Sequence, residues 1–302
     1  MTYSRQNNTV ISLNLTHPNG MKRGVFQNKD FRVGLSHAMN RQEIIDTVYV
    51  GQGQPFQVGP RPESPLYNER LATQYTEHNV ALANQHLDKV LPEKNGDGIR
   101  LGPDGQPFFV QLEFVPTYFA EWTPILELVQ QYWRAVGIDL RLKPEERSLF
   151  EERRSGNQPE ATVWEGEGGL EAMLAPRWYF PSSIWSYFAI PWANWFTQGG
   201  LRGEVNVEES EGVVAEPSDA ARQQMELYTQ IEGTADPAEQ ARLMTQLLEI
   251  AADQFWCMGI SLPIQGYGIR RTAFRNVPAP MLWAWEGQAP AATNPCQYFE
   301  AQ

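Results

Sequence analysis

The residues best suited to bind a ligand are aromatic, and they gather in one stretch. The 302 residues include 10 Trp, 11 Tyr and 14 Phe, and half of the tryptophans fall in residues 164–196. This stretch has no regular helical or alternating period and contains Trp164, Trp178, Tyr179, Phe180, Trp185, Tyr187, Phe188, Trp192, Trp195 and Phe196, with the charged residues Glu165, Glu167, Glu171 and Arg177. A long irregular segment of this kind favours a functional surface. Any single Trp is more simply explained as core packing, but for the group we expect a ligand surface with unusually exposed rings.

Glu165 and Glu167 also permit an enzymatic interpretation. Residues two apart on a strand point to the same side, roughly 6.5–7 Å apart, which lies within the carboxylate spacing of inverting glycosidases. Catalytic carboxylates must flank the scissile bond from opposite sides, and neighbours on one strand rarely do. A glycoside hydrolase-like protein using these two residues is therefore the alternative to a binding protein.

Other catalytic and metal-binding patterns lack support. Residues 34–38 resemble a nucleophile elbow, but they end on Ala38 and fall inside an amphipathic helical pattern. Walker A, dinucleotide-binding and His-Glu-x-x-His motifs are absent, no Cys-x-x-Cys occurs, and the four histidines are scattered. We therefore expect no cofactor and no metal. Cys257 and Cys296 are expected to be buried thiols, with a disulfide as the minority alternative.

The charge balance excludes two classes of partner. The chain has 24 Lys and Arg against 36 Asp and Glu, a formal charge of −12. Such a surface repels phosphate backbones and anionic headgroups, so we expect no nucleic acid and no membrane surface as the main partner. The 42% apolar content supports a real core of one large or two ordinary domains. No apolar run approaches the roughly 18 residues of a membrane span, and residues 1–8 lack a signal-peptide core.

Strand and helix patterns alternate along the chain, which predicts an α/β fold with helices packed on a mixed or parallel sheet. Alternation or short apolar runs predict strands at residues 9–15, 108–114, 138–142, 161–164 and 258–264, the second of them forming a hairpin with a short strand before it. Apolar periodicity predicts helices at residues 28–39, 41–48, 79–91, 121–135, 147–154, 218–231 and 237–255. Their expected N-caps include Asn28, Asn40, Asn79 and Ser218.

Residues 28–55 resemble a signature of the solute-binding proteins of ABC importers, family five, which bind oligopeptides, dipeptides, nickel or oligosaccharides. The family pattern runs Asp-x-Arg-Val-Arg-x-Ala-Leu-x-x-Ala-Ile-Asp-Arg-x-x-Ile, and the positions here that fit it in kind are Asp30, Arg32, Val33, Leu35, Ala38, Asn40, Arg41 and Ile45. The second Arg of the pattern is displaced, with Gly34 nearby. The resemblance continues through Tyr67, the helix after Asn79 and the helix-to-strand junction at residues 136–140, so it covers most of the chain.

The resemblance implies the C-terminal lobe of a periplasmic-binding-protein-like class II fold, a clamp of two lobes around the ligand. Residues 1–273 would form this α/β lobe with its mixed sheet, and residues 274–302 would be a tail that returns toward the N-terminal lobe. The N-terminal lobe and the signal sequence would then be missing from the chain.

The resemblance also points to a ligand site. In peptide-binding relatives a Trp at a strand end is followed three residues later by an Asp that pairs with the ligand's α-amino group, within a Trp-x-x-Asp-Tyr-x-Asp-Pro run. Here Glu167 follows Trp164 at that spacing, but residues 170–172 replace the Asp-Pro. This departure weakens a peptide interpretation and leaves room for a neutral oligosaccharide that stacks on Trp. The expected ligand-binding residues are Trp164, Glu165, Glu167, Arg177, Trp185, Tyr187, Trp192 and Trp195.

The function implied is that of the substrate-binding component of an ABC importer, without catalysis. It would capture a small peptide or an oligosaccharide by lobe closure and deliver it to the permease. We expect a monomer in the periplasm or outside the cell, where a lipoprotein tether would also suit the family.

Overall fold

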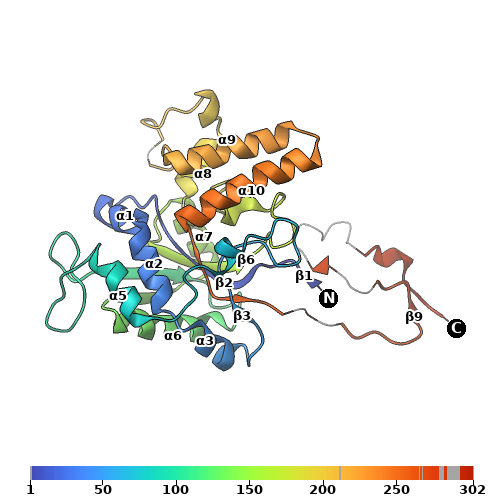
Figure 1. The fold of residues 1–302 in the computed structure, drawn as a ribbon, viewed down its shortest axis with the longest axis horizontal. Helices are drawn as coiled ribbons and strands as arrows, with labels where there is room; N and C mark the ends of the chain where they lie inside the picture. The colour runs from blue at the N-terminus through green and yellow to red at the C-terminus, as the bar shows by residue number, and fades with distance from the viewer. Residues whose placement is uncertain are drawn as a thin grey trace.

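A five-stranded mixed sheet forms the centre of the computed structural model, with strand order β5-β4-β6-β2-β7 (Figure 1). The structure describes residues 2–210, 212–264, 266, 268–278, 282–283 and 293–301. β4 runs parallel to β5 and β6, whereas β2 runs antiparallel to β6 and β7. The bounds are Asn7–Leu13 for β2, Phe109–Phe114 for β4, Asp139–Pro144 for β5, Ala161–Gly166 for β6 and Met258–Gly259 for β7. The predicted α/β class with a mixed sheet is confirmed.

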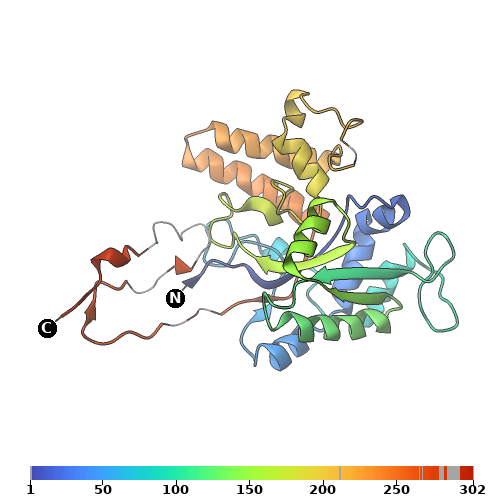
Figure 2. The same ribbon diagram turned by 180° about the vertical axis from the view of Figure 1, so that it is seen from behind.

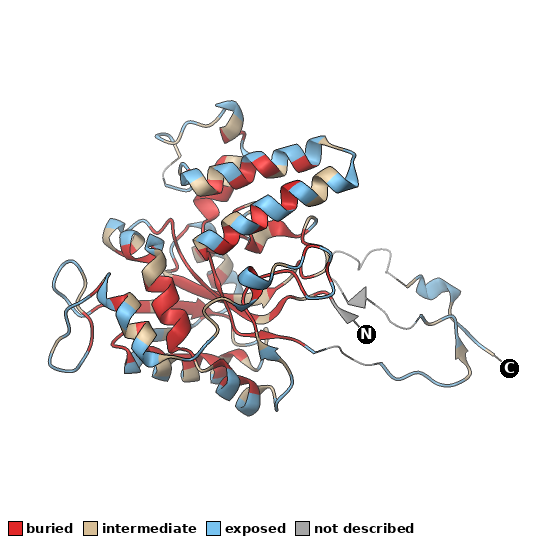
Figure 3. Cartoon of the chain, viewed as in Figure 1, coloured by how far each residue is buried: buried red, intermediate tan, exposed pale blue. Residues whose placement is uncertain are grey.

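Helices cover the sheet on opposite sides, with α9 and α10 on one side and α3 and α6 on the other (Figures 1 and 2). The inner strands are therefore buried on both faces, and Val10, Ile11 and Leu112 are fully buried (Figure 3). The helices are α1 Gly20–Gln27, α2 Lys29–Ala38, α3 Arg41–Val48, α4 Glu69–Thr73, α5 Val80–Asp88, α6 Trp122–Ala135, α7 Arg147–Ser155, α8 Ile190–Thr197, α9 Asp219–Gly233 and α10 Pro237–Gln254. Within the described residues, no helix combines the length and apolarity that a membrane span requires.

The predicted N-caps are confirmed. The side chains of Asn28, Asn40, Asn79 and Ser218 each accept a hydrogen bond from a backbone N–H in the first turn of the helix that follows. The side-chain amide of Asn40 in turn donates a hydrogen bond to the Glu43 carboxylate, at 3.1 Å. These local side-chain signals explain why α2, α3, α5 and α9 begin where the sequence predicts.

The predicted hairpin before β4 forms, but it is shorter than expected. Leu101 bridges Pro107 across the turn at residues 102–105, and the backbone N–H of Phe108 donates to the Arg100 carbonyl at 2.7 Å. The pairing stops before β4, because both edges of β4 are occupied by its parallel neighbours. The strand predicted at residues 258–264 is divided, because β7 pairs with β2 whereas β8 (Ser261–Leu262) pairs with β3 (Gln54–Pro55).

The two cysteines are both free, Cys257 buried and Cys296 exposed. The expectation of two buried thiols is therefore wrong for Cys296, and the alternative disulfide does not form. The 3-10 turn Pro295–Gln297 places Cys296 outside the packed sheet and helices.

Two short pairings lie outside the central sheet. β1 (Thr2–Tyr3) pairs in parallel with β10 (Leu282–Trp283), and β9 (Phe274–Arg275) pairs antiparallel with β11 (Phe299–Glu300). Figures 1 and 2 show β9 and the C-terminus extending away from the sheet, at the end of the molecule where the N-terminus also lies. The boundary at residue 273 stays a prediction.

Candidate ligand-binding site

Most of the predicted residues lie at one edge of the central sheet. Because β4, β5 and β6 are parallel, their carboxyl ends share this edge, and β2 begins there. Trp164 and Glu165 lie at the end of β6, and Arg5 lies just before β2. In open α/β sheets, ligands bind outside the carboxyl ends of the strands.

Trp164 is the centre of an aromatic cluster at this edge. Its ring lies 5.0 Å from Tyr118, 5.7 Å from Trp122, 6.4 Å from Phe150 and 5.3 Å from Tyr187, measured between ring centroids. The contacts come from α6, α7 and the segments beside them, so distant parts of the chain fix the orientation of this half-buried ring.

Glu167 is held by side chains from its own part of the sequence. Arg177 donates from Nε to Glu167 Oε2 at 3.1 Å and from Nη2 to Oε1, and Trp178 Nε1 donates to Oε2 at 2.9 Å. Burial lowers the pKa of Arg177, but the charge and hydrogen bonds of Glu167 raise it overall. The 3-10 turn Pro176–Trp178 carries both donors. The residue predicted to meet a ligand's amino group is therefore already paired.

Glu165 forms a second ion pair, with Arg5 Nη2 2.7 Å from its Oε2. Burial raises the pKa of the Glu165 carboxyl to about 7; Arg5 opposes this shift and the charge of Glu167 adds to it. Glu165 and Glu167 thus face two different arginines.

The raised pKa of Glu165 makes stability depend on pH. Its ordinary value is 4.5, so between about pH 4.5 and about pH 7 the folded state binds this proton more tightly, and the group's contribution to the free energy of unfolding falls as pH rises. Glu165→Gln removes this titration. We expect the variant to gain stability relative to the wild type from about pH 5 to about pH 8, measured by urea unfolding. A stability difference that is equal at both pH values would contradict this assignment.

Trp185 is the exposed ring of the site, with 40% of its surface accessible. The Arg154 guanidinium lies 4.5 Å and that of Arg177 6.0 Å from its ring centroid. Arg154 donates from Nε to Glu151 at 2.8 Å and from Nη1 to the carbonyl of Ile184. The Tyr187 ring packs edge-on at 6.3 Å, which joins Trp185 to the cluster around Trp164.

The other two tryptophans of the predicted site lie elsewhere. Trp192 and Trp195 are 5% and 4% exposed on α8, where Trp192 packs edge-on against Trp256 at 6.0 Å and Arg222 covers Trp195 at 4.6 Å. The expectation of an exposed aromatic group is wrong for most of residues 164–196, since the following rings are also buried: Trp178, Tyr179, Phe180, Tyr187 and Phe188. α8 and the turns before it bury these rings in the main hydrophobic core.

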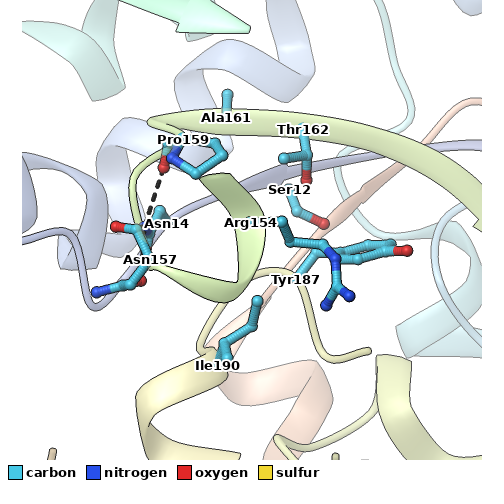
Figure 4. A pocket seen from close by; sticks show the side chains of 9 residues that line it. All are labelled: Ser12, Asn14, Arg154, Asn157, Pro159, Ala161, Thr162, Tyr187 and Ile190. Carbon is cyan, nitrogen blue, oxygen red and sulfur yellow. Dashed lines mark hydrogen bonds between the residues drawn. The ribbon is translucent and has the colours of Figure 1, made fainter. Parts of the chain in front are cut away.

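A small cavity lies beneath the site, between β2, β6 and α7 (Figure 4). Its walls include Ser12, Thr162, Arg154 and Tyr187, and the hydroxyls of Thr162 and Tyr187 have no hydrogen-bond partner among the described residues. The space of about 10 Å³ admits about one water molecule. This cavity is too small for a peptide or a sugar.

The described part of the chain contains no group of three or more His, Cys, Asp or Glu side chains placed to hold a metal ion.

Arg5, Tyr118 and Arg154 are site residues that the sequence did not indicate. Each reaches the edge from an element far from Trp164 in sequence, and no local pattern marks such long-range contacts.

A family comparison matches residues 1–185 to the bacterial extracellular solute-binding proteins, family 5 middle. Among curated proteins, the di/tripeptide-binding protein 1 of Pseudomonas aeruginosa is 26% identical over 164 residues, which cover 53% of this chain and 27% of that protein.

Solved structures confirm the fold. An oligopeptide-binding protein OppA superposes with a TM-score of 0.83 and 28% identity, over 100% of this chain and 48% of its own. The periplasmic binding protein MelB of Agrobacterium fabrum, solved in complex with stachyose, superposes with a TM-score of 0.67 over 91% of this chain and 40% of its own. At 17% sequence identity, this similarity supports the fold and nothing further. The chain therefore spans about half the length of OppA.

Proposed function

The chain belongs to the bacterial extracellular solute-binding proteins, family 5, and from this premise we propose that it is the ligand-binding part of an ABC-type importer. It captures a small peptide or an oligosaccharide and delivers it to the permease in the membrane. The superposition of the whole chain on OppA is the observation that carries this proposal. The family assignment itself confirms the resemblance of residues 28–55.

The binding mechanism is closure of two lobes around the ligand. In this proposal residues 1–273 form one lobe, and residues 274–302 return toward a second lobe that lies outside this chain. The pairing of β1 with β10 supports it, since it places residues 282–283 beside the strand that leads into β2. The edge that carries Trp164 and Trp185 would face the second lobe.

The proposed ligand contacts are Trp164, Glu165, Arg177 and Trp185, with Glu167 behind Arg177; the buried Tyr187 supports the two tryptophan rings and does not itself reach the ligand. Trp164 and Trp185 offer aromatic surface, and the charged groups supply the few polar contacts that set specificity. Trp192 and Trp195 are left out because they pack within the core.

The proposal includes no reaction. Glu165 pairs with Arg5 and Glu167 with Arg177, so the two carboxylates do not face a common substrate position as a glycosidase pair must. The relatives are also named for binding, which supports the binding function over the glycoside hydrolase alternative.

The remaining proposals follow from the family. The protein would work outside the cytoplasmic membrane, in the periplasm or at the cell surface, as a monomer that docks on the permease. A lipid anchor would hold it there if the gene encodes one.

A ligand screen tests the proposed function. The screen uses the protein expressed from its complete gene. We expect a di- or oligopeptide or an oligosaccharide to raise its melting temperature. A ligand that binds only the folded state stabilises that state by about 2.7 kcal/mol at a concentration of one hundred times Kd. Ni²⁺ is included in the same screen. No stabilisation by any compound, or cleavage products after incubation with oligosaccharides, would contradict the proposal.

A further inference from the structure

Three acidic side chains at the edge that carries Trp164 and Trp185 are paired with arginines. Glu151 is paired with Arg154, Glu165 with Arg5 and Glu167 with Arg177. All three carboxylates are largely buried, with side-chain exposures of 27%, 16% and 12%. These are therefore not loose surface pairs that an incoming ligand would exchange without cost.

The pair between Glu167 and Arg177 is the most constrained. Two donors of the guanidinium and the indole N–H of Trp178 hold the carboxylate, and two parallel bonds fix an arginine and a carboxylate more firmly than one. An ammonium group that approached Glu167 would feel the repulsion of Arg177 as well as the attraction of the carboxylate. It would also lose its own hydration, which is costly for a charge that gains no counter-charge.

Hydrogen-bonding capacity nevertheless remains at the edge. Arg177 Nη1 has no hydrogen-bond partner among the described residues, and Glu165 meets Arg5 through Oε2, which leaves Oε1. A hydroxyl group both donates and accepts, so it can use a guanidinium N–H and a carboxylate oxygen without bringing a charge. Beside them, Trp185 exposes part of an aromatic ring, on which the apolar face of a sugar can stack.

We propose that this edge receives a neutral, hydroxyl-rich ligand, as in an oligosaccharide, and does not receive the charged amino terminus of a peptide. The inference rests on the proposed function and selects between its two ligand classes. Arg177 is a contact to the ligand's hydroxyls, and Glu167 is a positioning residue that holds Arg177 in place.

The test uses three probes: trialanine with a free amino terminus, N-acetylated trialanine and neutral trisaccharides such as raffinose and maltotriose. We expect the wild type to bind a trisaccharide and to show no preference for the free amine over the acetylated peptide by calorimetry. Arg177→Met frees Glu167, and we expect it to favour the free amine about fivefold, the effect of an ion pair of about 1 kcal/mol. Adding Glu167→Gln to Arg177→Met should abolish this new preference, which a merely structural effect would not do.

Arg202→Met is the matched control, because it breaks an exposed pair with Glu204 on another part of the chain and should leave all three affinities unchanged. If the wild type prefers free-amine trialanine over its acetylated form, the inference is overturned while the proposed function is supported. The half-buried Glu121 beside Glu165 would then be the next carboxylate to replace, as a candidate partner of the amine. Binding of both peptides without any trisaccharide would overturn the hydroxyl-rich class. If neither these probes nor the wider screen shows binding, the proposed function fails as well.

Discussion

Replacing Trp164 with Ala is expected to weaken ligand binding at least tenfold. Truncating an aromatic hot-spot residue at the centre of a binding surface typically costs about 2 kcal/mol or more of binding free energy. A loss of about 1.4 kcal/mol already corresponds to a tenfold change in Kd. Here the loss has two parts, because Trp164 offers its own ring and also supports Tyr187, which in turn packs against Trp185. Calorimetry with the ligand identified by the screen measures the effect.

Trp192→Ala is the control for this prediction. It removes the same side chain from the same part of the sequence, but from α8, where the ring packs on Trp256 and is nearly fully buried. We expect the control to lower the melting temperature at least as much as Trp164→Ala while leaving Kd within about twofold. Unchanged affinity in Trp164→Ala, or equal losses of affinity in both variants, would refute the location of the site.

Asn7→Ala is expected to destabilise the folded state by about 3 kcal/mol, since each buried polar group left without a partner costs about 1–3 kcal/mol. The fully buried Asn7 side chain accepts from the backbone N–H groups of Ile260 and Ser261, at 2.9 and 3.0 Å, and donates to the carbonyls of Phe56 and Gln57, at 3.1 and 3.3 Å. It therefore joins three segments that are distant in sequence.

The neighbouring Asn8 provides the matched comparison. It lies on the same strand and is only half-buried, and its side chain makes no hydrogen bond within the described residues. Urea unfolding should show Asn8→Ala within about 0.5 kcal/mol of the wild type. Similar losses of stability in both variants would mean that the strand backbone, and not the Asn7 side chain, holds the segments together.

The elements that the sequence predicted well are those whose signals are local. Asn28, Asn40, Asn79 and Ser218 each cap the helix that directly follows. The hairpin before β4 is shorter than predicted, because β4 itself pairs with β5 and β6, which come later in the chain and cannot be inferred from residues 96–114.

The candidate site was predictable only in part for the same reason. Trp164 and Glu167 were indicated by a family pattern at a fixed spacing; in the structure Trp164 lies near the end of β6, and Glu167 directly follows that strand. α8 has eight residues and only two polar ones, so it shows too weak a periodicity to identify Trp192 and Trp195 as core residues. Arg5 and Arg154, which neutralise Glu165 and contact Trp185, reach the edge only through the fold.

The position of β2 has a consequence for the order in which the protein folds. This strand is made first among those of the central sheet, yet it lies between β6 and β7, and β7 begins only at Met258. During synthesis one edge of β2 therefore stays unpaired until almost the whole chain has left the ribosome. Pairing over such sequence distances is slow because a long loop must close first, so we expect the sheet to be completed only after translation of this segment ends.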